Sequence, residues 1–242
     1  MDLLSLPDQI LTCITLNLQL KDLLALGDVH SRLRELVYKN PEIWTSDLLF
    51  PVQDPNITDK FIKTIVPRIT RHYGILDLKM ICLPLSWKGY LMIFDQFAHS
   101  VKHIEIQATT RSLAALAHHL SVFAGNLTLL QRTNKIPITF RQYALDEDDD
   151  YALGDNLLHN LKDQFKHTKL DDPPFERLEK FQVSLVDQES SHLVQQLHVL
   201  TCFLSGRPVG ESNKRMREDY PFCSNKHIRH ETHSQAPHYL YQ

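Results

Sequence analysis

The residues best suited to hold a metal ion gather near the end of the chain. Histidine nitrogen and cysteine thiolate are the ligands that zinc prefers in proteins. A structural zinc site usually uses two ligand pairs that bracket a small hairpin or helix, whereas here one cysteine precedes a row of histidines with almost no aliphatic residues between them. We predict no resident metal and no cofactor, and keep a metal-binding protein as an alternative function. The residues concerned are Cys223, His227, His230, His233 and His238.

Two charged runs suggest other sites. Residues 146–150 read DEDDD, but an EF-hand loop needs ligands at alternating positions, a central glycine and a distal glutamate, and this run has none of that spacing. It predicts an exposed loop. The run KRMR from Lys214 to Arg217 has the composition of a nuclear import signal, yet a solvated tail is the preferred interpretation. Nuclear and cytoplasmic locations both stay open.

Catalytic chemistry finds little support in the sequence. The chain has 14 histidines, so Ser/His/Asp combinations occur by chance, but no GxSxG elbow or HExxH helix is present. With 7 glycines the chain also lacks GxGxxG and GxxxxGK[ST] phosphate loops. His118 and His119 are neighbours on a predicted helix, where adjacent side chains diverge by about 100° and cannot bind one metal ion together. We predict that the protein is not an enzyme.

Composition favours an intracellular protein that binds through local surfaces. The 242 residues are 43% hydrophobic with a net charge of −3, enough for one sizeable core and a small module. This charge predicts no general attraction to nucleic acid or membrane. No apolar run is expected to approach the roughly 20 residues needed to cross a bilayer, and the first residues lack the basic start of a secretory signal. The four cysteines form no CxxC pair, as expected of buried thiols in a reducing compartment.

The first part of the chain, residues 1–50, is predicted to form three short helices. Pro7 suits the first position of a helix, because its missing N–H would have no partner there. A second helix is expected from Asp22, as its cap, through Leu26, and a third from Val29 to Tyr38, since the residue before Pro41 avoids helical conformation. Three helices of this length cannot bury all their apolar residues among themselves. Some of these residues must therefore face a partner.

The order of these residues resembles an F-box. LPDQIL, KDLLAL, V-x-x-x-L-R-x-L and PEIW follow one another like that family's LPxE-I-L, DL pair, Val-Cys-x-x-Trp/Phe core and terminal Trp. Gln9, His30 and Leu33 replace the usual Glu, Cys and large aromatic residue, but they keep helix and apolar bulk. The matching residues are Leu6, Pro7, Ile10, Leu11, Leu18, Asp22, Leu23, Leu26, Val29, Arg34, Leu36 and Trp44.

The resemblance implies a binding partner. F-boxes pack their helices against the C-terminal helices of the Skp-type adaptor of SCF ubiquitin ligases, and through it they reach a cullin–RING ligase. In such a contact apolar helix surfaces interdigitate, and a few large side chains dominate the affinity. The alternative is that these are simply the first helices of an all-helical core. The residues expected to bind the adaptor, or to support the contact directly, are Leu6, Pro7, Ile10, Leu11, Leu23, Leu26 and Trp44.

Beyond a linker over residues 51–70, with one helix over 58–66, strands and helices are predicted to alternate. Period-two patterns of branched and aromatic residues predict strands at 75–80, 103–108, 136–140 and 181–186. Apolar residues at helical spacing predict helices at 87–97, 113–123, 153–165 and 193–204, the second ending at Gly125-Asn126. Such alternation indicates a parallel sheet with right-handed crossovers, or a solenoid.

The strands of residues 71–206 resemble leucine-rich repeats. Three of them fit the LxxLxL pattern, the strand at 136–140 does not, and the asparagine that normally follows is missing. The fold class expected is therefore α+β or α/β: a three-helix F-box over 1–50, a degenerate leucine-rich-repeat-like solenoid over 71–206, and a disordered His-rich tail over 207–242. Another α/β arrangement remains open. The matching segments are Tyr73-x-x-Leu76-x-Leu78, Val101-x-x-Ile104-x-Ile106 and Leu178-x-x-Phe181-x-Val183.

An F-box followed by leucine-rich repeats commonly uses the repeats to hold a substrate protein. The resemblance thus predicts a substrate-recognition subunit of an SCF-type ubiquitin ligase. An adaptor-binding F-box protein that acts outside a ligase is the alternative. Outward residues alternate with core residues along a strand, and they are either the substrate surface or simply solvated positions. The residues expected to bind substrate are Asp77, Lys79, His103, Glu105, Gln107 and Arg141, with Thr139, Gln182 and Ser184 on the same predicted face.

Overall fold

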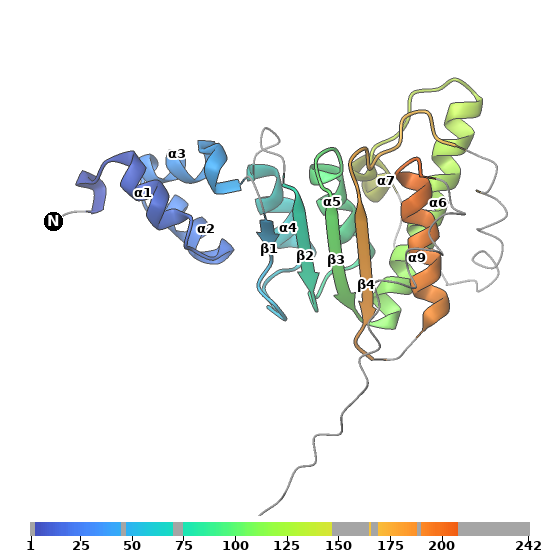
Figure 1. Ribbon diagram of the computed structural model, residues 1–242, viewed down its shortest axis with the longest axis horizontal. Helices are drawn as coiled ribbons and strands as arrows, with labels where there is room; N and C mark the ends of the chain where they lie inside the picture. Colours follow the sequence, from blue (N-terminus) through green and yellow to red (C-terminus); the bar gives the residue numbers. More distant parts are fainter. Residues whose placement is uncertain are drawn as a thin grey trace, which may run out of the picture. The chain divides into compact units, whose positions relative to one another are not determined.

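The computed structural model describes residues 3–44, 47–69, 75–146, 165, 169–187 and 190–207. This part of the chain combines helices with a parallel sheet (Figure 1), which confirms a mixed fold. The predicted helix at 153–165, apart from Phe165, and nearly all of the His-rich tail lie outside the described residues. The elements are η1 (Leu3–Ser5), α1 (Asp8–Thr15), α2 (Leu20–Val29), α3 (Ser31–Lys39), η2 (Pro41–Trp44), β1 (Asp47–Leu49), α4 (Asp59–Ile65), η3 (Val66–Arg68), β2 (Asp77–Ile81), α5 (Trp87–Phe97), β3 (His103–Ala108), α6 (Thr110–Arg132), α7 (Phe140–Asp146), β4 (Lys180–Leu185) and α9 (Ser191–Leu204).

The three N-terminal helices form where the sequence predicts them, with shifted boundaries. α3 begins at Ser31 rather than at Val29, because His30 is extended, with φ −151° and ψ 147°. The His30 ring caps this helix: its Nδ1 accepts a hydrogen bond from the Arg32 N–H at 3.1 Å. In contrast to the prediction, Asp22 is not the cap of α2, since this helix already begins at Leu20. It lies in the first turn, where the helix dipole favours an anion.

Leucines and one tryptophan form the buried centre of this helical segment. Leu33 and Val37 of α3 are buried together with Leu11, Leu23 and Trp44. The indole N–H of Trp44 donates to the carbonyl oxygen of Val37 at 2.6 Å, which satisfies its polar atom inside the core. These large apolar residues therefore hold the three helices together without a partner protein.

The sheet contains four parallel strands in sequence order, β1-β2-β3-β4. The predicted strands at 75–80, 103–108 and 181–186 correspond to β2, β3 and β4. β1 was not predicted, because a strand of 3 residues is too short to show alternation. Leu78 pairs with Ile104, which pairs with Phe181, so the buried side chains of neighbouring strands stand side by side.

The predicted strand at 136–140 is wrong. Residues 135–139 have no regular structure, and Phe140 is the first residue of α7. The cause is a capping box. The Thr139 hydroxyl accepts from the Gln142 N–H at 3.2 Å, and the Gln142 side chain accepts from the Thr139 N–H at 2.8 Å. Pro137, which has no N–H to donate to a neighbouring strand, also disfavours a strand here.

Helix α6 is longer than predicted. It passes through Gly125 and Asn126 and ends at Arg132, because buried residues continue on its inner side as far as Leu127. Asn134, with φ 52°, provides the left-handed residue that ends it. By length and composition alone α6 could span a bilayer, and 56% of its most apolar segment is buried within the described structure.

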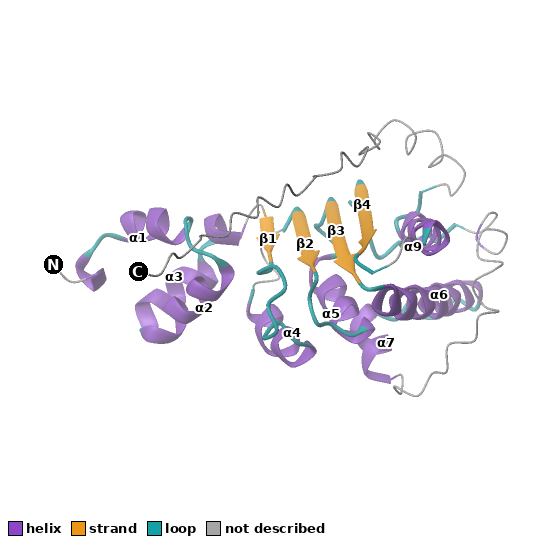
Figure 2. Ribbon diagram, turned by 90° about the horizontal axis from the view of Figure 1, so that it is seen from below, coloured by secondary structure: helices purple, strands orange, loops and turns teal. Residues whose placement is uncertain are grey.

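We call the described residues from β1 onward the body, and its helices cover one face of the sheet. Figure 2 shows α4, α5 and α6 on the same side of the four strands. On that side Met80, Ile106 and Val183 are buried, while the alternate residues are exposed or half-buried. The rings of Phe94 and Phe175 lie 5.3 Å apart, and both are buried. The opposite face carries none of the described helices and forms the open sheet face, defined as Asp77, Lys79, His103, Glu105, Gln107, Lys180, Gln182 and Ser184.

Candidate functional site

Helix α1 leaves an apolar strip uncovered. Ile10 and Ile14 are 48% and 40% exposed, and they lie one turn apart on the same side of the helix. Pro7 is exposed just before the helix, and Leu3 and Leu16 are exposed at either end of it. We call Leu3, Pro7, Ile10 and Ile14 the α1 face; Leu16 lies about 200° around the helix from Ile14 and is not part of it. Exposed aliphatic residues gathered on one helix indicate a surface that a partner covers.

The predicted adaptor-binding residues divide into two groups. Leu11, Leu23 and Trp44 are only 2%, 6% and 3% exposed, so they support the helices from inside and cannot be direct contacts. Pro7 and Ile10 are exposed. Leu6 and Leu26 are half-buried. Leu3, Ile14 and Leu16 are exposed as well but were not among the predicted residues, although the helical spacing of Ile10 and Ile14 was visible in the sequence.

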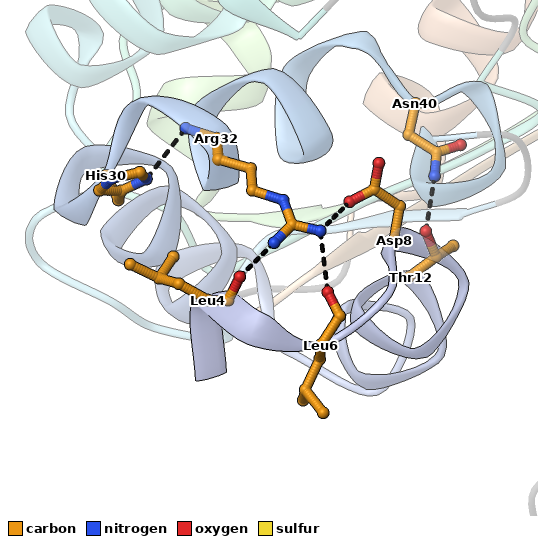
Figure 3. A network of polar contacts seen from close by, with 7 residues as sticks. All are labelled: Leu4, Leu6, Asp8, Thr12, His30, Arg32 and Asn40. Carbon is orange, nitrogen blue, oxygen red and sulfur yellow. Dashed lines mark hydrogen bonds and ion pairs between the residues drawn. The ribbon is translucent and has the colours of Figure 1, made fainter. Parts of the chain in front are cut away.

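An arginine clamp fixes the start of α1 against α3 (Figure 3). The guanidinium of Arg32 donates to the carbonyl oxygen of Leu4, to that of Leu6 at 2.8 Å, and to the carboxylate of Asp8 at 2.6 Å. The guanidinium thus satisfies two carbonyl oxygens that precede the helix and that would otherwise need water as a hydrogen-bond donor. The α1 face is therefore held in place by the chain's own contacts.

A second contact joins α1 to the end of α3, and a groove lies between the two helices. The side-chain amide of Asn40 donates to the Thr12 hydroxyl at 2.9 Å. The groove holds about 600 Å³. Its lining includes Cys13 and Leu16 from α1 and Leu36 from α3. Leu16 therefore lines this groove and not the α1 face, since Ile10 and Ile14 are not among the residues that line the groove.

The open sheet face carries polar side chains in rows across the strands. Because the strands are parallel and in register, residues at the same level on neighbouring strands are adjacent. A shallow depression of about 290 Å³ lies over the first two rows. The rows are Asp77–His103–Lys180, Lys79–Glu105–Gln182 and Ile81–Gln107–Ser184.

Most charges on this face already have partners. His103 Nδ1 is 2.6 Å from the Asp77 carboxylate and its Nε2 is 3.8 Å from that of Glu179. The Lys102 ammonium nitrogen lies 2.9 Å from a carboxylate oxygen of Glu179. The hydrogen bond from Lys102 and its positive charge hold the pKa of the Glu179 carboxyl below its usual value. Lys79 Nζ is 3.6 Å from Glu105. The face therefore carries compensated ion pairs rather than one sign of charge.

Seven of the nine predicted face residues, together with one that was missed, lie on this surface. Asp77, Lys79, His103, Glu105, Gln107, Gln182 and Ser184 project from the strands as expected. Lys180 was missed, because the predicted strand began one residue too late, although the alternation extends to it.

The prediction that Thr139 and Arg141 lie on the sheet face is wrong. No strand forms there, and Arg141 belongs to α7. Its backbone N–H donates to the Asp95 carboxylate at 3.0 Å, and its side chain lines a small pocket with Ile62 and Met92.

The described residues hold no group of metal ligands. No three His, Cys, Asp or Glu side chains gather as metal ligands among them, and the Cys223–His238 cluster lies outside them. His118 and His119 are both buried. The His119 ring stacks on Trp87 at 3.5 Å, so both histidines belong to the core of the body.

Comparisons with protein-family models, with curated proteins and with solved structures find no match to this chain. The two surfaces are therefore the basis on which a function can be argued.

Proposed function

We propose that this protein is the substrate-recognition subunit of an SCF-type ubiquitin ligase. Its α1 face docks a Skp-type adaptor, and its open sheet face holds a protein substrate. The protein itself performs no bond chemistry. It raises the effective concentration of the substrate beside the subunits that transfer ubiquitin.

The observation that carries the proposal is the exposed α1 face in a segment whose residue order resembles an F-box. The buried residues Leu11, Leu33 and Trp44 already stabilise the three helices, so Ile10 and Ile14 are not needed for their own core. Apolar side chains in an interface of this kind contribute most when they are central and desolvated. A helix surface on the adaptor is the partner whose chemistry fits them.

The topology of the body supports the second half of the proposal. Consecutive strands are neighbours, and the crossover helices lie on one side of them. A solenoid of leucine-rich-repeat type is built in this way, and it exposes the strand face that it uses for binding. The strands β1, β2 and β3 begin at residues 47, 77 and 103, intervals close to those of the longer repeats. The long connection from β3 to β4 makes the repeat degenerate.

The α1 face is tested by a double substitution, Ile10→Asp with Ile14→Asp. Both side chains are exposed, so the fold should survive, while two charges are placed where an apolar contact must exclude water. We expect binding to a purified Skp-type adaptor, measured by surface plasmon resonance, to weaken by at least about 100-fold. Leu11→Asp is unsuitable because this side chain is 2% exposed and its loss would unfold the helices.

Leu129→Asp is the matched control, because Leu129 is 61% exposed on α6 of the body and should not contact the adaptor. It should bind the adaptor like the wild type, and circular dichroism should show folded protein for both variants. A folded Ile10→Asp/Ile14→Asp protein with unchanged affinity would contradict the proposed docking surface. Adaptor binding without recruitment of a cullin in reconstitution would contradict the ligase role and leave an adaptor-binding protein that acts outside a ligase.

A further inference from the structure

We infer that the open sheet face binds an extended peptide segment with an acidic side chain, whose carboxylate pairs with Lys180. The inference rests on the proposed function, because it takes this face as the substrate surface. It names the chemistry of the segment that the surface would recognise.

Lys180 is the first residue of β4 and is exposed on the face. Its register partner on β3 is His103, which in turn pairs with Asp77 of β2. His103 Nδ1 is 2.6 Å from the Asp77 carboxylate, so the carboxylate of this row already has a hydrogen-bond partner. No side chain among the described residues forms an ion pair with Lys180, whereas Lys79 and Lys102 each have one.

The remaining acidic groups beside the face are also engaged. Glu105 pairs with Lys79 at 3.6 Å, and Glu179 pairs with Lys102 at 2.9 Å. A basic substrate would have to displace one of these lysines to find a carboxylate. An acidic substrate finds an ammonium group that donates three hydrogen bonds and has no counter-ion to displace.

Groups that can bind a peptide backbone follow Lys180 along the sheet. Gln182 and Ser184 are the next outward residues of β4, and Gln107 stands beside Ser184 on β3. Within the part of the chain that the structure describes, none of these three side chains has a hydrogen-bond partner. At about 3.3 Å per residue, Lys180 and Ser184 are separated by about 13 Å, the length of about four residues of extended peptide.

These features together specify the occupant. A segment laid along β4 would place its carboxylate at Lys180 and its backbone amides and carbonyls at the side chains of Gln182, Gln107 and Ser184. The depression of about 290 Å³ beside Lys180 and Gln182 offers room for a side chain of that segment.

The experiment is a selection of a display library of random 12-residue peptides on the full chain, with no adaptor present. The wild type should enrich Asp or Glu at one position of the selected peptides. Lys180→Gln, selected in parallel, should lose this enrichment. Lys60→Gln is the control: Lys60 is exposed on α4, outside the open sheet face, and the same charge is removed.

Fluorescence anisotropy on the best wild-type peptide then measures the pair directly. We expect Lys180→Gln to weaken binding about 10-fold, and an Asp→Asn change in the peptide to weaken binding to wild type by a similar factor but to have little further effect on Lys180→Gln. Selected peptides without an acidic preference, an acidic preference that survives Lys180→Gln, an equal loss in Lys60→Gln, or no selected peptide at all would each overturn the inference. Because the adaptor is absent, failure here is distinguishable from failure of the α1 face in adaptor binding.

Discussion

Single side chains in this protein can be assigned roles that their residue type alone does not reveal. Leu11, Leu23 and Trp44 look like interface residues in the sequence, yet they are buried within the chain. Ile10, which was among the predicted interface residues, and Ile14, which was not, are both exposed. The sequence predicts that apolar residues exceed what three helices can bury. It does not predict which of them remain outside, because that depends on how the Arg32 clamp and the Trp44 ring orient the helices.

Tyr90 allows a prediction at this scale. It is completely buried in α5, and its hydroxyl has no hydrogen-bond partner among the described residues. Burial, with smaller effects of Cys82 and Asp59, raises the pKa of the phenol far above its usual value, so the group stays neutral. Tyr90→Phe removes an unsatisfied polar atom and should leave the free energy of unfolding unchanged or raise it by about 1 kcal/mol.

Tyr143→Phe provides the comparison, because the Tyr143 hydroxyl lies 3.1 Å from His119 Nδ1 and its loss should cost about 0.5–1.5 kcal/mol. Urea denaturation of both variants measures the difference. A greater loss of stability in Tyr90→Phe than in Tyr143→Phe would show that the Tyr90 hydroxyl has a partner.

At the scale of helices and strands, periodicity in the sequence is a good guide where it is long and a poor one where local chemistry competes. The alternation of apolar residues predicts β2, β3 and β4 within a few residues. It fails at residues 136–140, where the Thr139–Gln142 capping box starts a helix. The predicted helix end at Gly125 is also wrong. A glycine ends a helix only if the chain turns into the left-handed region there, and in α6 this happens at Asn134.

Two of the helical glycines, Gly89 and Gly125, should respond oppositely to alanine. In α5, a Cβ at Gly89 would strike the carboxylate of Asp59, which accepts a hydrogen bond from the Ser86 N–H at 3.0 Å. Gly89→Ala should therefore lower the melting temperature. At Gly125 in α6 a Cβ meets nothing within 4 Å, so Gly125→Ala should add about 0.5–1 kcal/mol of stability through helix propensity.

Thermal unfolding followed by circular dichroism at 222 nm compares the two glycine variants with the wild type. An increase in melting temperature for Gly89→Ala would mean that Asp59 moves away without loss, and that its hydrogen bond to Ser86 does not help to hold α5 against α4.

For the molecule as a whole, ionisation links stability to pH in two ranges. Burial, and secondarily the charge of Arg207, lower the pKa of His198 in α9 below its ordinary value, so the unfolded chain takes up this proton first as the pH falls. Hydrogen bonds from Lys21 and Lys102 lower the pKa of Asp54 and Glu179 respectively. The stability that Asp54 and Glu179 contribute is complete above their pKa values in the unfolded chain, about 4. It is lost as the pH falls through their lower pKa values in the folded protein.

His198→Gln should therefore be less sensitive to acid than the wild type in the upper range. As the pH is lowered from about 7 to 5, through the ordinary histidine pKa of about 6.5, the wild type should lose stability and the variant should lose less. The readout is the difference between their free energies of unfolding by urea at each pH, because other histidines contribute equally to both proteins. A difference that stays constant from pH 7 to 5 would contradict the effect of burial on His198.

The alternation along β2, β3 and β4 separates folding from recognition within the same few residues. Leu78, Ile104 and Phe181 face the helices, while their immediate neighbours Lys79, Glu105 and Gln182 face solvent. In the course of evolution, exchanges at the solvent-facing positions can change what the sheet binds at little cost to the packing beneath it. Related chains with this architecture should therefore keep their inner residues and diverge in the outer ones.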